Sequence, residues 1–185
     1  MDIQNLIFEF IAKIKDNKIE IYNEAGIQHE LAIFLRSRIT DYTIQLEKNI
    51  SYFELDKKEF EKKEIDIVLF NKDKKDKIAI EIKFPRNGQY PEQMFSFCKD
   101  IKFLEQLKHH GFQDNIFLAL ADDSNFWNNN GGEGTIYHKF RNLKLLSGQI
   151  VKPTGAKDKT IQLSNEYRIE WKELNDTTKF FVLKI

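Results

Sequence analysis

The chain has 185 residues, and its 29 lysines and arginines balance 29 aspartates and glutamates, so its formal net charge at pH 7 is zero. That length suits one domain, residues 1–185, with a sizeable core, and the zero net charge argues against strong non-specific binding to nucleic acid. No apolar run could cross a bilayer, no signal-peptide pattern is present, and the histidines show no zinc-site spacing with the one cysteine. We therefore expect a cytoplasmic protein that does not contact a membrane.

Two helical patterns occupy the first part of the chain. Apolar side chains recur at helical spacing between residues 3 and 14, and again between residues 23 and 36, where Asn23 is a suitable N-cap. Glu30 lies on the apolar stripe of the second helix, so its carboxylate needs either a functional role near the core or an ion pair with a nearby arginine. Glu24 is expected to be a first-turn residue that the helix dipole favours.

A strand-like segment and a charged run follow these helices. Residues 42–50 have the composition of a strand, and Glu47 within them is an acidic candidate that competes with Glu30. The run at residues 56–64 is rich in lysine and glutamate and has the polarity of a solvated loop.

The most informative feature is a pair of apolar strand patterns, residues 64–70 and 78–84, that carry three charged residues. Side chains alternate along a strand, so Asp66 falls on one face of the first strand, and Glu81 and Lys83 share one face of the second. The lysine-rich segment between the strands has the polarity of a hairpin turn. If Asp66 pairs with Glu81 or with Lys83 across the hairpin, all three charges lie on one face of the sheet.

Charged groups inside apolar strands need partners, because burying them alone is costly. One interpretation is a partly buried ion pair, in which Lys83 contacts Asp66 or Glu81 and the other carboxylate stays near water. The other is a metal site, in which Asp66 and Glu81 supply oxygen ligands to a divalent cation such as Mg²⁺. In that site Lys83 would orient or deprotonate the attacking water.

The spacing of Asp66, Glu81 and Lys83, as Asp-x(14)-Glu-x-Lys on one hairpin face, resembles the catalytic motif of the PD-(D/E)XK nuclease superfamily. The proline that nominally precedes the aspartate is replaced by Ile65, at a position where the motif is loose. The resemblance covers about residues 20–121. It implies an α/β fold with a restriction-endonuclease-like αβββαβ core, in which helices flank a central mixed sheet.

The resemblance also implies roles for particular residues. Family members usually carry another acidic residue on the helix before the hairpin, so the implied metal ligands are Asp66, Glu81 and Glu30, with Lys83 as the fourth catalytic residue. The implied cofactor is Mg²⁺, with Mn²⁺ as a substitute. The implied activity is that of an endonuclease of the restriction, defence or repair type with double-stranded DNA as its substrate; an RNA-cleaving member of the family would have the same sequence pattern. A catalytically silent domain that binds nucleic acid or a protein partner is the alternative.

A turn-rich loop at residues 85–91 follows the hairpin and would leave the sheet beside Lys83. Arg86, Asn87 and Gln89 in this loop are candidates for contact with a nucleic-acid backbone.

A helix and a strand come next in the expected order. The helix is expected over residues 91–110, with Gly111 as its stop and Cys98 buried on its apolar stripe. Most of its polar side chains are expected to be solvated; they include Asp100, Lys102, Glu105 and Gln106. The continuous apolar run at residues 116–121 predicts a buried strand, parallel to its neighbour.

The last third of the chain, residues 122–185, is expected to consist of additions to this core. A helix is expected within residues 136–146, with Phe140 and Leu143 facing inward. Short strands are expected at residues 161–163, 167–174 and 179–184, and the last two would form a C-terminal β-hairpin.

Cleavage of both strands of a duplex makes a two-fold homodimer an attractive assembly. The C-terminal hairpin would be its candidate surface if the core leaves the apolar side of the hairpin free. The residues of that surface are Trp171, Phe180, Phe181 and Val182.

Overall fold

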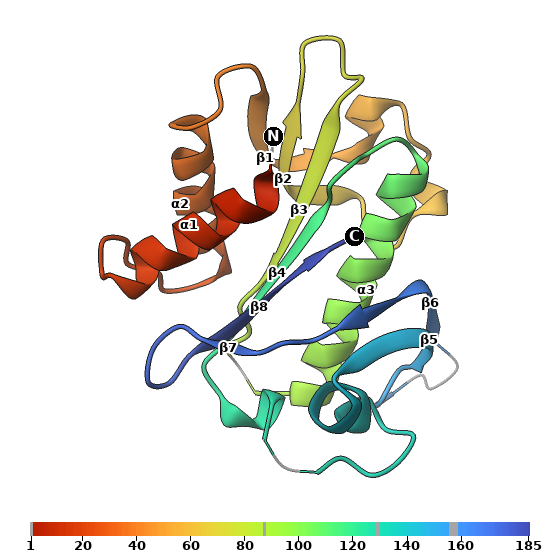
Figure 1. Ribbon diagram of the computed structural model, residues 1–185. Helices are drawn as coiled ribbons and strands as arrows, with labels where there is room; N and C mark the ends of the chain where they lie inside the picture. The colour runs from red at the N-terminus through yellow and green to blue at the C-terminus, as the bar shows by residue number, and fades with distance from the viewer. Residues whose placement is uncertain (1, 87, 129, 156–158) are drawn as a thin grey trace.

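A mixed sheet of six strands runs through the centre of the protein, with helices against both of its faces (Figure 1). The computed structural model describes residues 2–86, 88–128, 130–155 and 159–185. In spatial order the strands are β1 (Thr43–Asn49), β2 (Glu64–Phe70), β3 (Lys77–Lys83), β4 (Ile116–Ala121), β8 (Lys179–Lys184) and β7 (Lys172–Glu173). β3 and β4 are parallel, whereas the pairs β1–β2, β2–β3, β4–β8 and β8–β7 are antiparallel.

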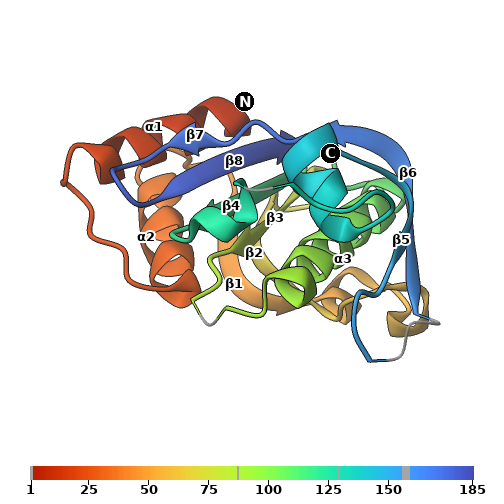
Figure 2. The same ribbon diagram turned by 90° about the horizontal axis from the view of Figure 1, so that it is seen from below.

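Two helices cover one face of this sheet and a third covers the other (Figure 2). α1 (Ile3–Lys15) and α2 (Glu24–Arg36) lie on the first face, and α3 (Tyr90–His109) lies on the second. The Asn23 side chain caps α2 by accepting a hydrogen bond of 2.8 Å from the backbone N–H of Gly26. Gly111 follows α3 with a φ of +85°, the left-handed conformation that commonly ends helices.

A separate two-stranded antiparallel sheet packs against α3 on the side away from the central sheet (Figures 1 and 2). Its strands are β5 (Leu145–Val151) and β6 (Thr160–Arg168). Short helical turns lie in the connections of the chain: η1 (Ile50–Phe53), η2 (Lys57–Glu59), η3 (Ser124–Phe126) and η4 (His138–Leu143).

Apolar side chains fill both faces of the central sheet. Ile80 and Ile82 of β3 pack in the cluster that contains α1 and α2, whereas Ala79 of the same strand belongs to the cluster around α3. Because β3 is covered on both faces, a charged side chain on it must find its partners inside the protein.

The structure confirms a mixed α/β fold with a central mixed sheet flanked by helices. α2, β1, β2, β3, α3 and β4 follow one another in the expected order, and β4 is a buried strand parallel to β3. Among the described residues, no helix has the length and apolar character that a bilayer crossing requires.

The last third of the chain differs from expectation in three respects, apart from the strands expected at residues 161–163 and 167–174. Residues 161–163 lie within β6, and the second expected strand is divided between the end of β6 and β7. Residues 145–151 form strand β5, and Leu143 is 53% exposed because η4 ends there, although Phe140 is buried as expected. β8 pairs with β4 inside the central sheet, so the C-terminal hairpin β7–β8 is part of that sheet and not an addition beside it.

The expected dimer surface is the third difference, because the apolar side chains of that surface are packed in the core. Phe181 lies in the cluster around α3, Phe180 lies in the cluster around α1 and α2, and Trp171 and Val182 pack against these clusters. The hairpin therefore offers no free apolar side for a second copy of the chain.

Candidate active site

Two carboxylates meet where the β2–β3 ladder ends. The last paired residues are Ile67 and Ile80, and Asp66 and Glu81 come next on their respective strands. The backbone N–H of Asp66 donates to Glu81 Oε1 at 3.2 Å, and the backbone N–H of Ile82 donates to Asp66 Oδ2 at 2.8 Å. Glu81 is fully buried and Asp66 is 5% exposed. The register of the hairpin is therefore one that brings Asp66 and Glu81 together, although the paired residues end one position earlier.

A third carboxylate approaches from α3. Asp100 is 2% exposed, and its Oδ2 atom lies 3.0 Å from Lys83 Nζ. The expectation that the polar residues of this helix are mostly solvated is wrong: Asp100 and Glu105 are buried, and Lys102 and Gln106 are half-buried. Asp100 is buried because its turn of α3 packs against the face of β3 that carries Glu81 and Lys83. Asp100 was missed because its chain position alone does not reveal which face of a long helix meets the sheet.

Lys62 places its ammonium group among these three carboxylates. Its Nζ atom lies 3.3 Å from Asp66 Oδ1 and 3.5 Å from Asp100 Oδ1, and it also contacts Glu81 Oε2. Its side chain is only 23% exposed, so the prediction of a solvated loop is wrong at this residue. The loop turns toward the core just before β2, and Lys62 contacts the carboxylate of Asp66, which lies four residues later in the chain.

Lys83 lies between α2 and α3 at the end of β3. Its Nζ atom is 3.3 Å from Glu24 Oε1, in addition to its contact with Asp100, and Glu24 Oε2 accepts the backbone N–H of Phe84 at 3.2 Å. The ion pair expected for Lys83 with Asp66 or Glu81 is therefore replaced by pairs with Glu24 and Asp100.

Glu24, and not Glu30, is the acidic residue that α2 contributes. Glu30 is half-buried, and among the described residues neither Lys62 nor Lys83 forms an ion pair with it. It lies six residues further along α2, a rise of about 9 Å away from the end of β3. Glu47 lies in β1, but it has no paired residue in the register with β2, is exposed and has a φ of +47°. No local sequence signal distinguished Glu24, because only the packing of the first turn of α2 against the end of β3 brings it to the cluster.

The loop after β3 contributes little to this cluster in the described residues. Arg86 pairs with Asp122 at 3.3 Å, and its guanidinium lies 5.0 Å from the ring centre of Phe84. Gln89 is exposed and immediately precedes α3, with a φ of +48°. Asn87 lies outside the described residues.

The cluster carries more negative than positive charge. It contains four carboxylates, of Glu24, Asp66, Glu81 and Asp100, and two ammonium groups, of Lys62 and Lys83, so full ionisation leaves a surplus of two negative charges.

Burial and the neighbouring charges shift the pKa values of the groups in the cluster. Burial raises the pKa of Glu81 well above its ordinary value, and the neighbouring charge of Asp66 adds to this rise. Burial also raises the pKa values of Asp100 and Glu24. For both lysines burial acts to lower the pKa, but the surrounding carboxylates outweigh it, so that the pKa of Lys62 and that of Lys83 are raised.

The donor set suits a divalent cation in kind and in charge. Carboxylate oxygens are the ligands that Mg²⁺ and Mn²⁺ take in proteins, and the surplus of two negative charges equals the charge of one such ion. Among the described residues, no three potential ligand residues are already gathered around one metal position. The space between Asp66 and Glu81 is instead filled by the Lys62 ammonium, which must withdraw before a cation can bind there.

The chain was compared with protein-family models, curated proteins and solved structures, and none of them matches it.

Proposed function

We propose that this protein is a Mg²⁺-dependent phosphodiesterase with a PD-(D/E)XK-like site that cleaves nucleic acid, with double-stranded DNA as the first substrate to test. The observation that carries this proposal is the convergence of four carboxylates and two lysines at the end of β3, which leaves a surplus of two negative charges when all the groups are ionised. A purely structural ion-pair cluster would be better balanced, because uncompensated buried charge is destabilising. Mg²⁺ would be the cofactor, and Mn²⁺ would replace it.

Asp66 and Glu81 are the residues that would hold the metal, and Asp100 and Glu24 would complete the negative field around it. When bound, the metal supplies a water of lowered pKa and positive charge to neutralise the phosphate. The backbone hydrogen bonds of Asp66 and Glu81 fix the two carboxylates before any cation arrives. Such preorganisation is what a site that stabilises developing charge requires.

Lys83 would act as a charged donor rather than as a base. Its neighbours Asp100 and Glu24 raise its pKa, so the ammonium keeps its proton at neutral pH. A protonated Lys83 can donate a hydrogen bond to a phosphate oxygen and so orient the scissile group. This role refines the interpretation in which Lys83 removes a proton from water.

The activity test uses purified protein with supercoiled plasmid, single-stranded DNA and RNA, in EDTA, Mg²⁺ or Mn²⁺. We expect cleavage that depends on the metal, and loss of cleavage in Asp66→Asn and Glu81→Gln. Glu24→Gln should reduce cleavage, whereas Glu30→Gln on the same helix should not. Metal-dependent cleavage that survives Asp66→Asn would show a contaminating nuclease and would remove the support for this site.

A second candidate function is a catalytically silent domain that binds nucleic acid or a protein partner. The position of Lys62 favours it, because this ammonium satisfies Asp66 and Glu81 without a metal. The two functions differ in one measurement. The phosphodiesterase should bind Mn²⁺ in a titration followed by electron paramagnetic resonance and lose that binding in Asp66→Asn, whereas the silent domain should bind none.

A further inference from the structure

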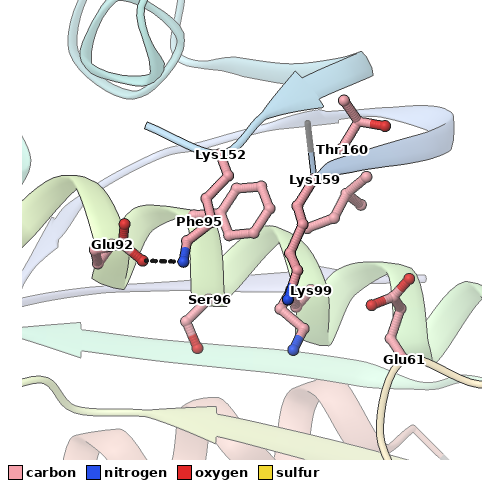
Figure 3. A pocket seen from close by; sticks show the side chains of 9 residues that line it. Glu61, Glu92, Phe95, Ser96, Lys99, Lys152, Lys159 and Thr160 are labelled. Carbon is pink, nitrogen blue, oxygen red and sulfur yellow. Dashed lines mark ion pairs between the residues drawn. The ribbon is translucent and has the colours of Figure 1, made fainter. Parts of the chain in front are cut away.

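A hollow of about 520 Å³ lies between α3 and the β5–β6 hairpin (Figure 3). Phe95 and Ile161 line its apolar part, and Ser96 and Thr160 add hydroxyl groups. The charged groups on its wall are three lysines and two glutamates: Lys99, Lys152, Lys159, Glu61 and Glu92.

The charges around this hollow are unevenly matched. Glu92 pairs with Lys152 at 3.6 Å and also accepts a hydrogen bond from the Thr154 hydroxyl. Among the described residues, neither Lys99 nor Lys159 has a carboxylate within ion-pair distance. In Figure 3 the side chains of Lys99 and Lys159 lie on the same side of the view as Glu61, away from the Glu92–Lys152 pair. After the Glu92–Lys152 pair, Lys99 and Lys159 face the single carboxylate of Glu61, so the wall has an excess of one positive charge, which favours an anion as the occupant of the hollow.

Hydrogen bonds fix the β5–β6 hairpin, which carries Lys152 and Lys159. Lys152 and Lys159 are bonded across the hairpin, because the backbone N–H of Lys152 donates to the Lys159 carbonyl at 2.9 Å. The buried carboxylate of Glu105 on α3 accepts the backbone N–H groups of Ser164 and Asn165 at 2.9 and 3.0 Å. The hairpin is thus fixed to the same helix that carries Lys99.

The hollow and the acidic cluster share two elements. α3 presents Ser96 to the hollow and, one turn later, Asp100 to the cluster, a rise of about 6 Å along the helix. The loop before β2 presents Glu61 to the hollow and Lys62 to the cluster. The hollow and the cluster of four carboxylates therefore lie on neighbouring parts of the same two elements.

We propose that this hollow binds the phosphodiester backbone of a nucleic-acid strand beside the cleavage site, with Lys99 and Lys159 as its phosphate contacts. The inference rests on the proposed function only for the direction in which the strand runs from the hollow, which is toward the carboxylates. Binding of the strand itself needs no metal. This site would also allow a protein of zero net charge to bind nucleic acid, because the positive charges that contact the phosphates are gathered in one hollow.

The test measures anisotropy of a short fluorescein-labelled single-stranded oligonucleotide in EDTA and low salt, where no cleavage occurs. We expect Lys99→Gln and Lys159→Gln each to weaken binding roughly fivefold and to flatten the dependence of log K on log salt by about 0.7. Glu61→Gln should strengthen binding, because it removes the opposing charge. Lys72→Gln is the matched control, since Lys72 is exposed in the turn at the far end of the β2–β3 hairpin.

Three results would overturn this inference. The first is an unchanged affinity in both lysine variants, and the second is an equal loss of affinity in Lys72→Gln. The third is displacement of the oligonucleotide by inorganic pyrophosphate at the same concentration as by unlabelled strand. This third result would show that the hollow is a site for free phosphate. Failure of the proposed function is distinguishable: binding that depends on Lys99 and Lys159 would persist in EDTA while Mn²⁺ binding and cleavage are absent. Conversely, metal-dependent cleavage with an unchanged KM in both lysine variants would overturn the inference alone.

Discussion

Asp66 and Glu81 close the end of the β2–β3 ladder with their own side chains. Glu81 Oε1 accepts the backbone N–H of Asp66 at 3.2 Å, and Asp66 Oδ2 accepts the backbone N–H of Ile82 at 2.8 Å. The carboxylates thus take the place of ladder carbonyls, so each is an acceptor for the backbone as well as a charge in the cluster. Replacement by alanine would leave a buried N–H without a partner, and the amide isosteres are therefore the informative variants.

Asp66→Asn separates a catalytic from a structural role. The amide oxygen can still accept the Ile82 N–H, and Lys62 keeps Glu81 and Asp100 as partners. We expect the apo variant to be as stable as wild type, or more stable by about 1 kcal/mol, because the negative surplus falls. Melting curves in EDTA and in Mn²⁺ should show a metal-dependent stabilisation, roughly 2.7 kcal/mol at a hundredfold excess over Kd, in the wild type only.

A structural role predicts the opposite pattern for this variant. If Asp66 mainly neutralises a buried ammonium, Asp66→Asn should cost roughly 3–5 kcal/mol in EDTA, and Mn²⁺ should not stabilise the wild type. That pair of results would end the metal-site proposal.

Lys62→Gln tests whether this ammonium competes with a cation. Its removal leaves Asp66, Glu81 and Asp100 with less compensation, so the apo protein should lose roughly 2 kcal/mol, less than the about 3–5 kcal/mol of a fully buried pair. The same change should strengthen Mn²⁺ binding severalfold in a titration followed by electron paramagnetic resonance. Lys63→Gln, at an exposed neighbouring position, is the control and should change neither quantity. Weaker Mn²⁺ binding in Lys62→Gln would contradict the competition.

The hairpin portion of the site could be predicted from sequence because its determinants are local. Alternation along residues 64–70 and 78–84 places Asp66, Glu81 and Lys83 on one face, and a hairpin brings the strands together with little freedom of register. The helices were predictable for the same reason, since capping by Asn23 and the apolar periodicity act within a few residues.

The remaining members of the cluster depend on how elements distant in the chain pack together. Lys62, Asp100 and Glu24 lie in segments whose polarity is typical of surfaces, and only their packing against β3 encloses them. Glu30 satisfied the helical pattern better than Glu24, yet the end of β3 lies beside the first turn of α2. Strand β5 was missed because a short helical pattern at residues 136–146 overlaps its start.

The stability of the apo protein should depend on pH through Glu81. Burial raises its pKa above the ordinary 4.5, so between these two values the folded state binds more protons than the unfolded state. This contribution to stability is lost as pH rises through the folded pKa. The raised pKa values of Lys62 and Lys83 add no slope here, because their contribution is fully present below the ordinary value of 10.5.

Glu81→Gln isolates this dependence on pH. The amide keeps an acceptor for the Asp66 N–H and cannot ionise, so the stability of the variant relative to wild type should increase by about 1 kcal/mol or more between about pH 5 and about pH 8. Chemical unfolding in EDTA at several pH values measures it. A difference between the two proteins that does not change with pH would show that Glu81 is fully ionised or fully protonated throughout.

Glu105→Gln should loosen the β5–β6 hairpin. Burial acts to raise the pKa of Glu105, but the N–H groups of Ser164 and Asn165, the Tyr167 hydroxyl and Lys102 outweigh it and lower the pKa. The variant loses these charge-assisted hydrogen bonds, at a cost of roughly 2–3 kcal/mol at neutral pH. The wild type should lose the same contribution as pH falls below the ordinary value of 4.5 through the lowered pKa, since protonation has the effect of the substitution.

This last variant also connects the hairpin to strand binding. Because Glu105 holds β6 on α3, its substitution should weaken oligonucleotide binding in EDTA even though Lys99 and Lys159 are intact. Glu170→Gln, at an exposed position just after β6, should affect neither stability nor affinity. Unchanged oligonucleotide affinity in Glu105→Gln, together with the expected loss of stability, would mean that the lysines bind phosphate without the fixed hairpin. Hydrogen exchange of the β6 amides would show whether the hairpin had loosened in that case.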